Sequence, residues 1–295
     1  MNSTTTAPLP VIACIDGTKK SDRVVAWAAH QARVQQTELV VVQVRPFTLQ
    51  TSPSRAGRGA DITAVADYAA AATRRHPSIP VTARLVRGRV SEELINLSRH
   101  AAQLVIGSDR TRDHDTEGRL ASLGEVLAVS ALCPVVVVAS SMTGAQSPPR
   151  VVVGWAPNAP ASDYALREAA AQAYARSAQL MVIILNDFQP VPRNTRTVPA
   201  VVTTPLHVLV EELQHLYPGL AIRTRRGKGR VAEGLATAAI GAELLVVGCH
   251  HSANPWSLRT GPTAVTLMRT SPCPLMLVGT RSRRTRPVAA SALRR

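Results

Sequence analysis

The sequence repeats itself at a spacing close to 141 residues over most of its 295 residues. The segment GRVSEEL, which begins at Gly88, returns as GRVAEGL at Gly229, an offset of 141 (229 − 88). The segment CPVVVV from Cys133 is matched by CPLMLV from Cys273, an offset of 140 (273 − 133). Because motifs of different kinds keep an almost constant offset, the chain is predicted to contain a duplicated domain.

The joint between the two copies is expected in the segment SSMTGAQSPPR, which is rich in serine, glycine and proline. The chain is therefore divided into a first domain at 1–140, a linker at 141–150 and a second domain at 151–280. A basic tail at 281–295 has the composition of a disordered segment.

Each copy alternates short apolar runs with segments of helical periodicity. VIACID and ELVVVQV are continuous apolar runs, as expected for strands that are buried on both faces of a sheet. Helices are predicted between these runs and near 62–75, 91–101 and 120–130. Strands that alternate with helices predict a parallel sheet covered on both faces by right-handed crossovers. Each domain is therefore predicted to be a five-stranded, doubly wound α/β unit.

The formal net charge of +15 raises nucleic acid and acidic membranes as partners. Basic residues gather in the tail and in a second cluster made of Arg223, Arg225, Arg226, Lys228 and Arg230. Aromatic residues make up only 3% of the chain, so the stacking platforms of single-strand binders are scarce. Nucleic-acid binding through the basic tail is kept as an alternative.

Several classes of protein are not expected from this sequence. No apolar stretch reaches the roughly 20 residues of a membrane helix, and the first residues do not resemble a signal peptide. We therefore expect a cytoplasmic protein without membrane contact. The four cysteines are too few for a disulfide framework and are expected to be reduced. The chain has neither a G-x-S-x-G segment nor a lysine-bearing phosphate loop, so no dedicated enzyme is expected.

Ligands of doubly wound sheets bind at the carboxyl ends of the strands, where the strand order reverses. In the first copy these ends are the turn at Asp16, Val44 with its loop, and the loop after Gly107. Glycine-rich turns that lead into helices offer backbone N–H groups to phosphate. The residues leave two interpretations of Asp16 open: contact with a nucleoside, or capping of the following helix.

The ordered motifs VIACIDGTKKSDRVVAWAAHQA, GRVSEEL, QLVIGS and CPVVVV, with their partners in the second copy, make the chain resemble the universal stress protein family in its tandem form. The resemblance implies two tandem flavodoxin-like, doubly wound, five-stranded parallel-sheet domains. It also implies pairing of the domains through their last strands, or a homodimer. In one branch of the family, ATP is held by an Asp after the first strand, by the backbone after the second strand, and by a loop of the form G-x-x-G, nine residues, G-S or G-T.

On that pattern the first copy offers Asp16 for the nucleoside, Val44 for adenine, and Gly107, Arg110 and Gly124 for the phosphates. Its loop departs from the pattern, because Arg110 replaces the middle glycine and Gly124 comes late and precedes a glutamate. Carboxylates inside the loop would repel phosphate, while neighbouring arginines would offset them. The resemblance therefore implies weak ATP binding in the first domain, with magnesium only as the nucleotide's own ion.

The second copy departs from the pattern in a different way. Ala156 stands in the place of Asp16, and His251 replaces the middle glycine between Gly248 and Gly261. A proline follows in place of the hydroxyl residue and offers no donor. We therefore interpret Gly248, His251 and Gly261 as a degenerate phosphate loop.

The adjacent side chains of Cys249, His250 and His251 are not expected to bind a metal, because they diverge and no zinc-ligand spacing accompanies them. The leading interpretation of the chain is a regulatory binding module of the stress response. Two alternatives are a scaffold of the same fold that binds no nucleotide, and a basic binder of polyanions or nucleic acid.

Overall fold

The computed structural model of the protein describes residues 8–18, 20–46, 55–108, 122–139, 144, 146–157, 159–186, 204–249 and 261–282, with the side chains of all of these except 55–62 and 186. The strands in this part of the chain are β1 Val11–Ile15, β2 Leu39–Arg45, β3 Val81–Arg87, β4 Gln103–Gly107, β5 Val135–Val138, β6 Arg150–Gly154, β7 Gln179–Asn186, β8 Ile222–Lys228, β9 Leu244–Cys249 and β10 Leu275–Gly279. The helices are α1 Ser21–Gln35, α2 Arg55–Arg75, α3 Val90–Ser98, α4 Leu123–Ser130, α5 Pro160–Ala175, α6 Leu206–Leu216, α7 Val231–Ala238 and α8 Pro262–Thr270.

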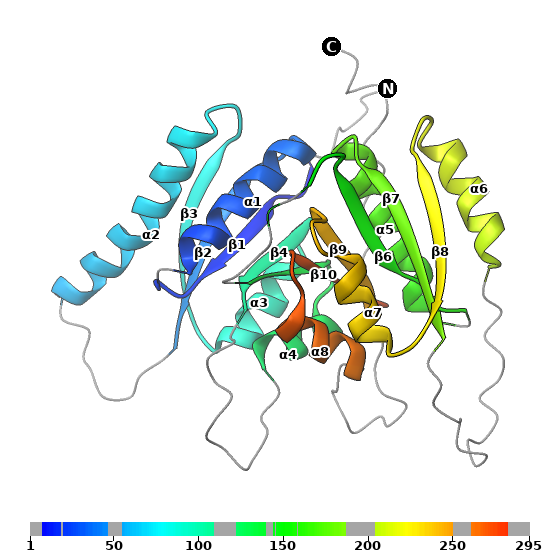
Figure 1. Ribbon diagram of the computed structural model, residues 1–295. Coiled ribbons are helices and arrows are strands. Elements are labelled where there is room, and N and C mark those ends of the chain that lie inside the picture. The colour runs from blue at the N-terminus through cyan, green and yellow to red at the C-terminus, as the bar shows by residue number, and fades with distance from the viewer. Residues whose placement is uncertain are drawn as a thin grey trace, which may run out of the picture.

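The strands form one ten-stranded sheet, in the order β3-β2-β1-β4-β5-β10-β9-β6-β7-β8 (Figure 1). All neighbouring strands are parallel except β5 and β10, where Leu275 lies opposite Val137 and Leu277 opposite Val135 in an antiparallel pair. The two halves of the chain are therefore joined through their last strands, about an approximate two-fold axis. Because β5 and β10 already pair with each other, neither offers a free edge to a second copy of the chain.

The predicted fold class is confirmed, since each half is a five-stranded doubly wound unit in which strands and helices alternate. The order within each half is 3-2-1-4-5, whereas flavodoxin itself has the order 2-1-3-4-5. The difference arises because the crossover through α2 places β3 outside β2, so that the first strand lies at the centre of the sheet. This arrangement leaves the reversal of strand order between β1 and β4.

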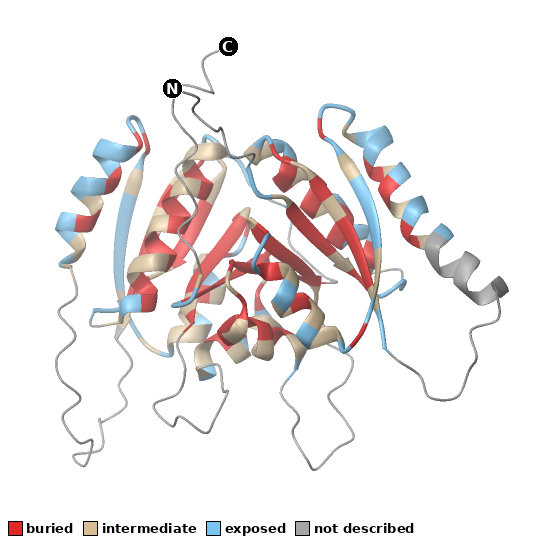
Figure 2. Ribbon diagram, turned by 180° about the vertical axis from the view of Figure 1, so that it is seen from behind, coloured by how far each residue is buried: buried red, intermediate tan, exposed pale blue. Residues whose placement is uncertain are grey.

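Successive side chains along each strand pack alternately into two apolar layers, one on each face of the sheet. Val11, Ala13 and Ile15 of β1 pack into the layer that contains α1, α2, α5 and α6. Ile12 of β1 packs on the other face, in the layer that contains α3, α4, α7 and α8. Figure 2 shows the central strands in red and the two end strands, β3 and β8, largely in pale blue. The sheet is therefore buried at its centre and exposed at both ends.

The helix boundaries differ modestly from those expected. The helix expected near 62–75 begins at Arg55, and the one expected at 91–101 ends at Ser98. The helix expected near 120–130 is described from Leu123, after Ser122, whose hydroxyl oxygen accepts the N–H of Glu125. No helix among the described residues has the length and the apolar character needed to cross a membrane.

Helices α1 and α5 meet near the two-fold axis through buried polar side chains. Arg176, which follows α5, donates hydrogen bonds to the side-chain oxygens of Gln31 and Gln172. Its Nε also lies 3.6 Å from Oε2 of Glu243, and its side chain is 3% exposed. The contact between α1 and α5 is therefore a polar network set beside an apolar layer, and it adds to the pairing of β5 with β10.

Candidate functional site

Three polar residues lie at the carboxyl ends of β1 and of the strands on either side of it, β2 and β4, and the strand order of the first half reverses between β1 and β4. Asp16 follows β1, Gln43 lies near the end of β2, and Ser108 follows β4. In doubly wound folds this is the place where ligands bind. It is therefore the candidate site of the first half.

Asp16 holds the loop between β1 and α1 in place. Its Oδ1 atom accepts hydrogen bonds from the N–H of Thr18 at 2.9 Å, from the hydroxyl of Thr18 at 2.7 Å and from the hydroxyl of Ser21 at 3.0 Å. Helix α1 begins at Ser21, and its N-cap residue is Lys20, so Asp16 is not the helix cap that one interpretation proposed. Asp16 instead ties the exposed loop to the first residue of the helix.

The ionised form of Asp16 is favoured in this loop. Partial burial acts to raise the pKa of the Asp16 carboxyl, but the hydrogen bonds from Thr18 and Ser21 outweigh burial and hold the pKa below its ordinary value. Asp16 therefore carries a negative charge at neutral pH and is an acceptor of hydrogen bonds.

Gln43 lies directly beneath this loop. It stands opposite Ile15 in the β1–β2 register and is only 2% exposed. Gly17 has a φ of +80°, and a Cβ added there would lie 3.3 Å from Nε2 of Gln43. The left-handed φ of Gly17 favours glycine, and a side chain there would also crowd the Gln43 amide over which the loop passes. The Oε1 atom of Gln43 is buried and has no hydrogen-bond partner.

Ser108 presents a second unpartnered polar atom at the end of β4. Its N–H donates to the carbonyl oxygen of Val138 at 3.0 Å, and the residue is 6% exposed. Its Oγ atom is buried without a partner. A buried polar group that lacks a hydrogen bond costs about 1–3 kcal/mol, so these two groups, at the ends of the strands on either side of β1, each call for a ligand or bound water.

The second half replaces all three polar residues by apolar ones. At offsets of 140 or 141, Asp16 corresponds to Ala156, Gln43 to Ile184 and Ser108 to Cys249. Ile184 and Cys249 are buried in the apolar layers of the second half. The equivalent place in the second half therefore lacks the polar groups of the first.

The backbone also closes the second half at this place. A Cβ on Gly248 would lie 2.3 Å from the carbonyl oxygen of Ala161 and 2.9 Å from the backbone nitrogen of Ser162, so the first turn of α5 rests against the end of β9. A Cβ on Gly107 would meet only Cγ2 of Val24, at 3.5 Å, which is an ordinary contact. Little room therefore remains beside Gly248, whereas the corresponding place in the first half is more open.

The other residues singled out from the sequence have varied positions. Val44 lies near the end of β2, half-buried, and Gly107 is the last residue of β4. Gly261 is the N-cap residue of α8. Arg110 and His251 lie outside the described residues, so the two predicted phosphate loops are not traced between their ends.

Gly124 has a clear packing role. It lies in the first turn of α4, and a Cβ there would lie 2.8 Å from Sδ of Met268 in α8. The absence of a side chain at Gly124 therefore lets a helix of the first half approach one of the second.

Gln43 and Ser108 were missed by the sequence analysis. Gln43 interrupts an otherwise apolar run, VVVQV, and Ser108 was seen only as part of the motif QLVIGS. A comparison of the two copies position by position would have found them, since Ile184 and Cys249 occupy their places.

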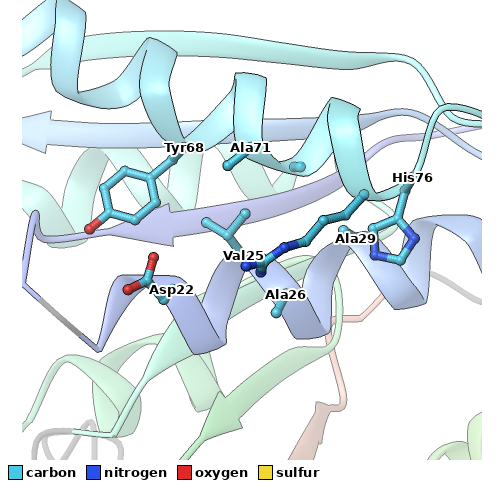
Figure 3. A pocket seen from close by; sticks show the side chains of 9 residues that line it. Asp22, Val25, Ala26, Ala29, Tyr68, Ala71 and His76 are labelled. Carbon is cyan, nitrogen blue, oxygen red and sulfur yellow. The ribbon is translucent and has the colours of Figure 1, made fainter.

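A small crevice lies between α1 and α2, next to the loop of this site (Figure 3). Tyr68 of α2, His76 just after α2 and Asp22 of α1 line it, and the hydroxyl of Tyr68 donates to the carbonyl oxygen of Thr18 at 3.3 Å. Its volume of about 20 Å³ has room for a single water molecule. The crevice is therefore too small for a nucleotide.

The structure offers no metal site in the parts of the chain that it describes. No group of three or more histidine, cysteine, aspartate or glutamate side chains is close enough to hold an ion there. Cys249 is buried in an apolar layer, and burial raises the pKa of its thiol to about 12, so the sulfur is a neutral thiol at neutral pH. His250 and His251 lie outside the described residues.

Two doubly wound α/β units that share one sheet, with polar strand ends in the first unit only, define a tandem protein of the α/β class. The model of the universal stress protein family matches residues 9–139 and 149–279. The chain therefore belongs to the universal stress protein family, in a tandem two-domain form, as its motifs implied.

Two curated relatives are universal stress proteins of Mycobacterium tuberculosis, from strains CDC 1551 / Oshkosh and ATCC 25618 / H37Rv. Each is 31% identical to this chain over 129 residues, which make up 43% of this chain and 47% of the relative. This chain thus spans about half the length of the curated relatives that it matches.

Solved structures share the whole two-unit fold. A universal stress protein from Archaeoglobus fulgidus DSM 4304 is similar with a TM-score of 0.67 and 17% identity, over 92% of this chain and 97% of that one. A functionally unknown protein from Pseudomonas aeruginosa PAO1 is similar with a TM-score of 0.54 and 13% identity, over 92% and 93%. At these identities the likeness concerns the fold alone.

Proposed function

We propose that the protein is a cytoplasmic, non-catalytic regulatory module that binds an adenine nucleotide such as ATP in its first half and uses its second half as a structural partner. Membership of the universal stress protein family supports a role in the stress response. The observation that carries the nucleotide proposal is the difference between the halves: Asp16, Gln43 and Ser108 are polar, and their counterparts are apolar.

The polar groups of the first half suit a nucleoside. The ionised carboxylate of Asp16 accepts hydrogen bonds, and ribose hydroxyls and the amino group of adenine donate them. The Oε1 atom of Gln43 and the Oγ atom of Ser108 are buried acceptors without partners. A ligand that brings donors to the strand ends would offset the desolvation of these atoms.

The phosphate end of the ligand is held less firmly in this proposal. Gly107, the last residue of β4, is not crowded, since an added Cβ would make only an ordinary contact with Val24, and a phosphate-binding turn needs such a glycine. Gly124, however, serves the contact with Met268, and Glu125 follows it. We therefore expect affinity to come mainly from the nucleoside, so adenosine should bind nearly as well as ATP.

The test is a calorimetric titration of the full chain with ATP, ADP and adenosine, with and without magnesium. Gln43→Leu should weaken nucleotide binding by about tenfold, which corresponds to the loss of one buried hydrogen bond. Cys249→Ala, at the position that corresponds to Ser108, is the control in the second half and should leave the affinity unchanged.

Two results would contradict the proposal. Absence of binding by the unmodified chain at millimolar nucleotide would favour the scaffold alternative, which the closed end of β9 at Gly248 supports for the second half. Equal losses in Gln43→Leu and Cys249→Ala would mean that the ligand does not distinguish the two halves.

A further inference from the structure

Strand β8 forms one end of the ten-stranded sheet, with β7 as its neighbour, and no strand among the described residues pairs with its outer side. The N–H of Leu180 donates to the carbonyl oxygen of Ala221 at 2.9 Å, so the backbone of Ala221 faces β7. Backbone groups of a strand alternate in direction, and those of Thr224 and Arg226 therefore point outward. An edge strand with outward backbone groups can accept a further strand.

The same strand concentrates positive charge. Four of its seven residues, IRTRRGK, are basic, and residues 221–230 contain no acidic side chain. Arg223, Arg225 and Arg226 are exposed, and none of the three forms an ion pair within the described part of the chain. Their charges are therefore available to an acidic partner.

The arginines lie on both faces of the strand. Arg223 and Arg225 stand in register with Met181 and Ile183, whose side chains belong to the apolar layer of α7. Arg226 stands in register with Ile184, whose side chain belongs to the layer of α5 and α6. Positive side chains thus flank the open backbone from above and below.

Strand β3, at the opposite end of the sheet, occupies an equivalent edge position but carries a different distribution of charge. Strand β3 carries two arginines, Arg84 and Arg87, in seven residues. Acidic side chains lie close to it, since Thr82 donates to Oε1 of Glu38 at 2.8 Å and Arg89 pairs with Glu92 at 3.2 Å. A few scattered charges of this kind are the usual protection of an edge strand against aggregation with other chains. Strand β8 carries more positive charge than this protection requires.

We propose that β8 is a docking edge for an extended acidic peptide, which adds to the sheet as a further strand. Its backbone would pair with the outward groups of Thr224 and Arg226. Its carboxylates, which alternate between the faces of an added strand, would meet Arg223 and Arg225 on one face and Arg226 on the other. A nucleic acid would pair with the arginine side chains but would not form hydrogen bonds with the outward backbone groups. An extended acidic peptide would engage both.

Amide hydrogen exchange of the full chain tests this proposal directly. The probe is a peptide of about seven residues, rich in glutamate and valine, which matches the length of β8. Binding should slow the exchange of the Thr224 and Arg226 amides and should weaken as salt rises. A peptide of the same sequence with alternate backbone nitrogens methylated keeps its charge but cannot form the ladder, and it should bind at least about tenfold more weakly.

Charge reversal provides matched variants at the two ends of the sheet. The double variant Arg223→Glu and Arg225→Glu should lower the affinity for the probe by about tenfold or more, whereas Arg84→Glu with Arg87→Glu on β3 should leave it unchanged. All four side chains are exposed, so these variants should keep the fold, which circular dichroism checks. A chain that ends at Ser282 controls for the basic tail and should bind as the full chain does.

Three outcomes would overturn the proposal. The first is equal affinity for the methylated and unmethylated peptides, and the second is protection of amides outside β8. The third is tighter binding of duplex DNA or of phosphatidylserine vesicles than of the peptide, with the same dependence on Arg223 and Arg225 and without protection of Thr224, which would assign the surface to a nucleic acid or a membrane.

Discussion

Gln31 and Gln172 occupy equivalent positions in the two halves, and Nε2 of Gln31 donates a buried hydrogen bond of 2.8 Å to Oε1 of Gln172. Nε2 of Gln172 donates in turn to Oε1 of Glu168 at 2.8 Å. Burial lowers the pKa of the neighbouring Arg176 to about 10, although Glu243 and Glu168 oppose this change, and the guanidinium stays charged at neutral pH. The halves are therefore fixed against each other by hydrogen bonds that have a single correct geometry.

Replacement of Gln31 by leucine should destabilise the chain. Gln31→Leu removes the acceptor of the Arg176 Nη2 group and one of the two donors to Oε1 of Gln172, so the free energy of unfolding should fall by about 1–3 kcal/mol in urea denaturation. Gln35→Leu on the same helix is the control, since Gln35 is half-buried and its side chain forms no hydrogen bond within the described ranges, and its effect should stay within about 0.5 kcal/mol. Equal effects of the two changes would show that the network adds nothing to stability.

Substitutions in the candidate site should affect stability and binding in opposite directions. Gln43→Leu and Ser108→Cys remove buried polar atoms that have no partner, so the ligand-free chain should become more stable, by up to about 1–3 kcal/mol each. The stabilisation that ATP confers on the unmodified chain should become smaller in both variants. Urea denaturation with and without ATP measures both quantities. A loss of stability in the ligand-free variants would mean that bound water already satisfies these atoms.

Alanine substitutions at the equivalent glycines Gly107 and Gly248 should change the stability of the chain by different amounts. Gly248→Ala places a methyl group 2.3 Å from the carbonyl oxygen of Ala161, and backbone must move to relieve the contact, so a loss of at least about 2 kcal/mol is expected. Gly107→Ala meets only Val24 at 3.5 Å and should cost less than about 1 kcal/mol. Thermal unfolding of both variants is the measurement. Similar melting temperatures would contradict the close approach of α5 to β9.

The pH dependence of stability should reveal the environment of Asp16. Its pKa in the folded chain lies below its ordinary value of 3.8, so its contribution to stability is complete above that value and is lost as the pH falls through the folded pKa. Asp16→Asn should therefore flatten the decline of stability below about pH 4. Urea denaturation of both chains at a series of pH values from about 2.5 to about 7 provides the measurement. Parallel pH profiles of the unmodified chain and Asp16→Asn would show that ionisation of Asp16 does not stabilise the folded state.

The fold could be predicted largely from the sequence because its signals are local. The offset between GRVSEEL and GRVAEGL revealed the duplication, and apolar runs such as VIACID located the buried strands. The sheet order was less accessible, since the side of β2 on which β3 is added depends on how α2 packs. Pairing of the last strands came from the resemblance to a family and not from any pattern in CPVVVV or CPLMLV.

The site was predictable in part. Asp16 stood out as a carboxylate at the end of an apolar run, and its exact hydrogen bonds to Thr18 and Ser21 required the folded loop. Gln43 and Ser108 have meaning only once their burial without partners is known, and burial is a tertiary property. The close approach at Gly248 likewise depends on where α5 lies.

The strands β5 and β10 that join the two halves belong to one covalent chain, so the two sides of the interface can be substituted independently. In an assembly of two identical chains, every substitution near the axis appears twice, once on each side. Here Trp27 on one side corresponds to Glu168 on the other, and Gln35 corresponds to Arg176. One polypeptide can therefore hold a charged residue opposite a neutral one, and either half can diverge while the other keeps its chemistry.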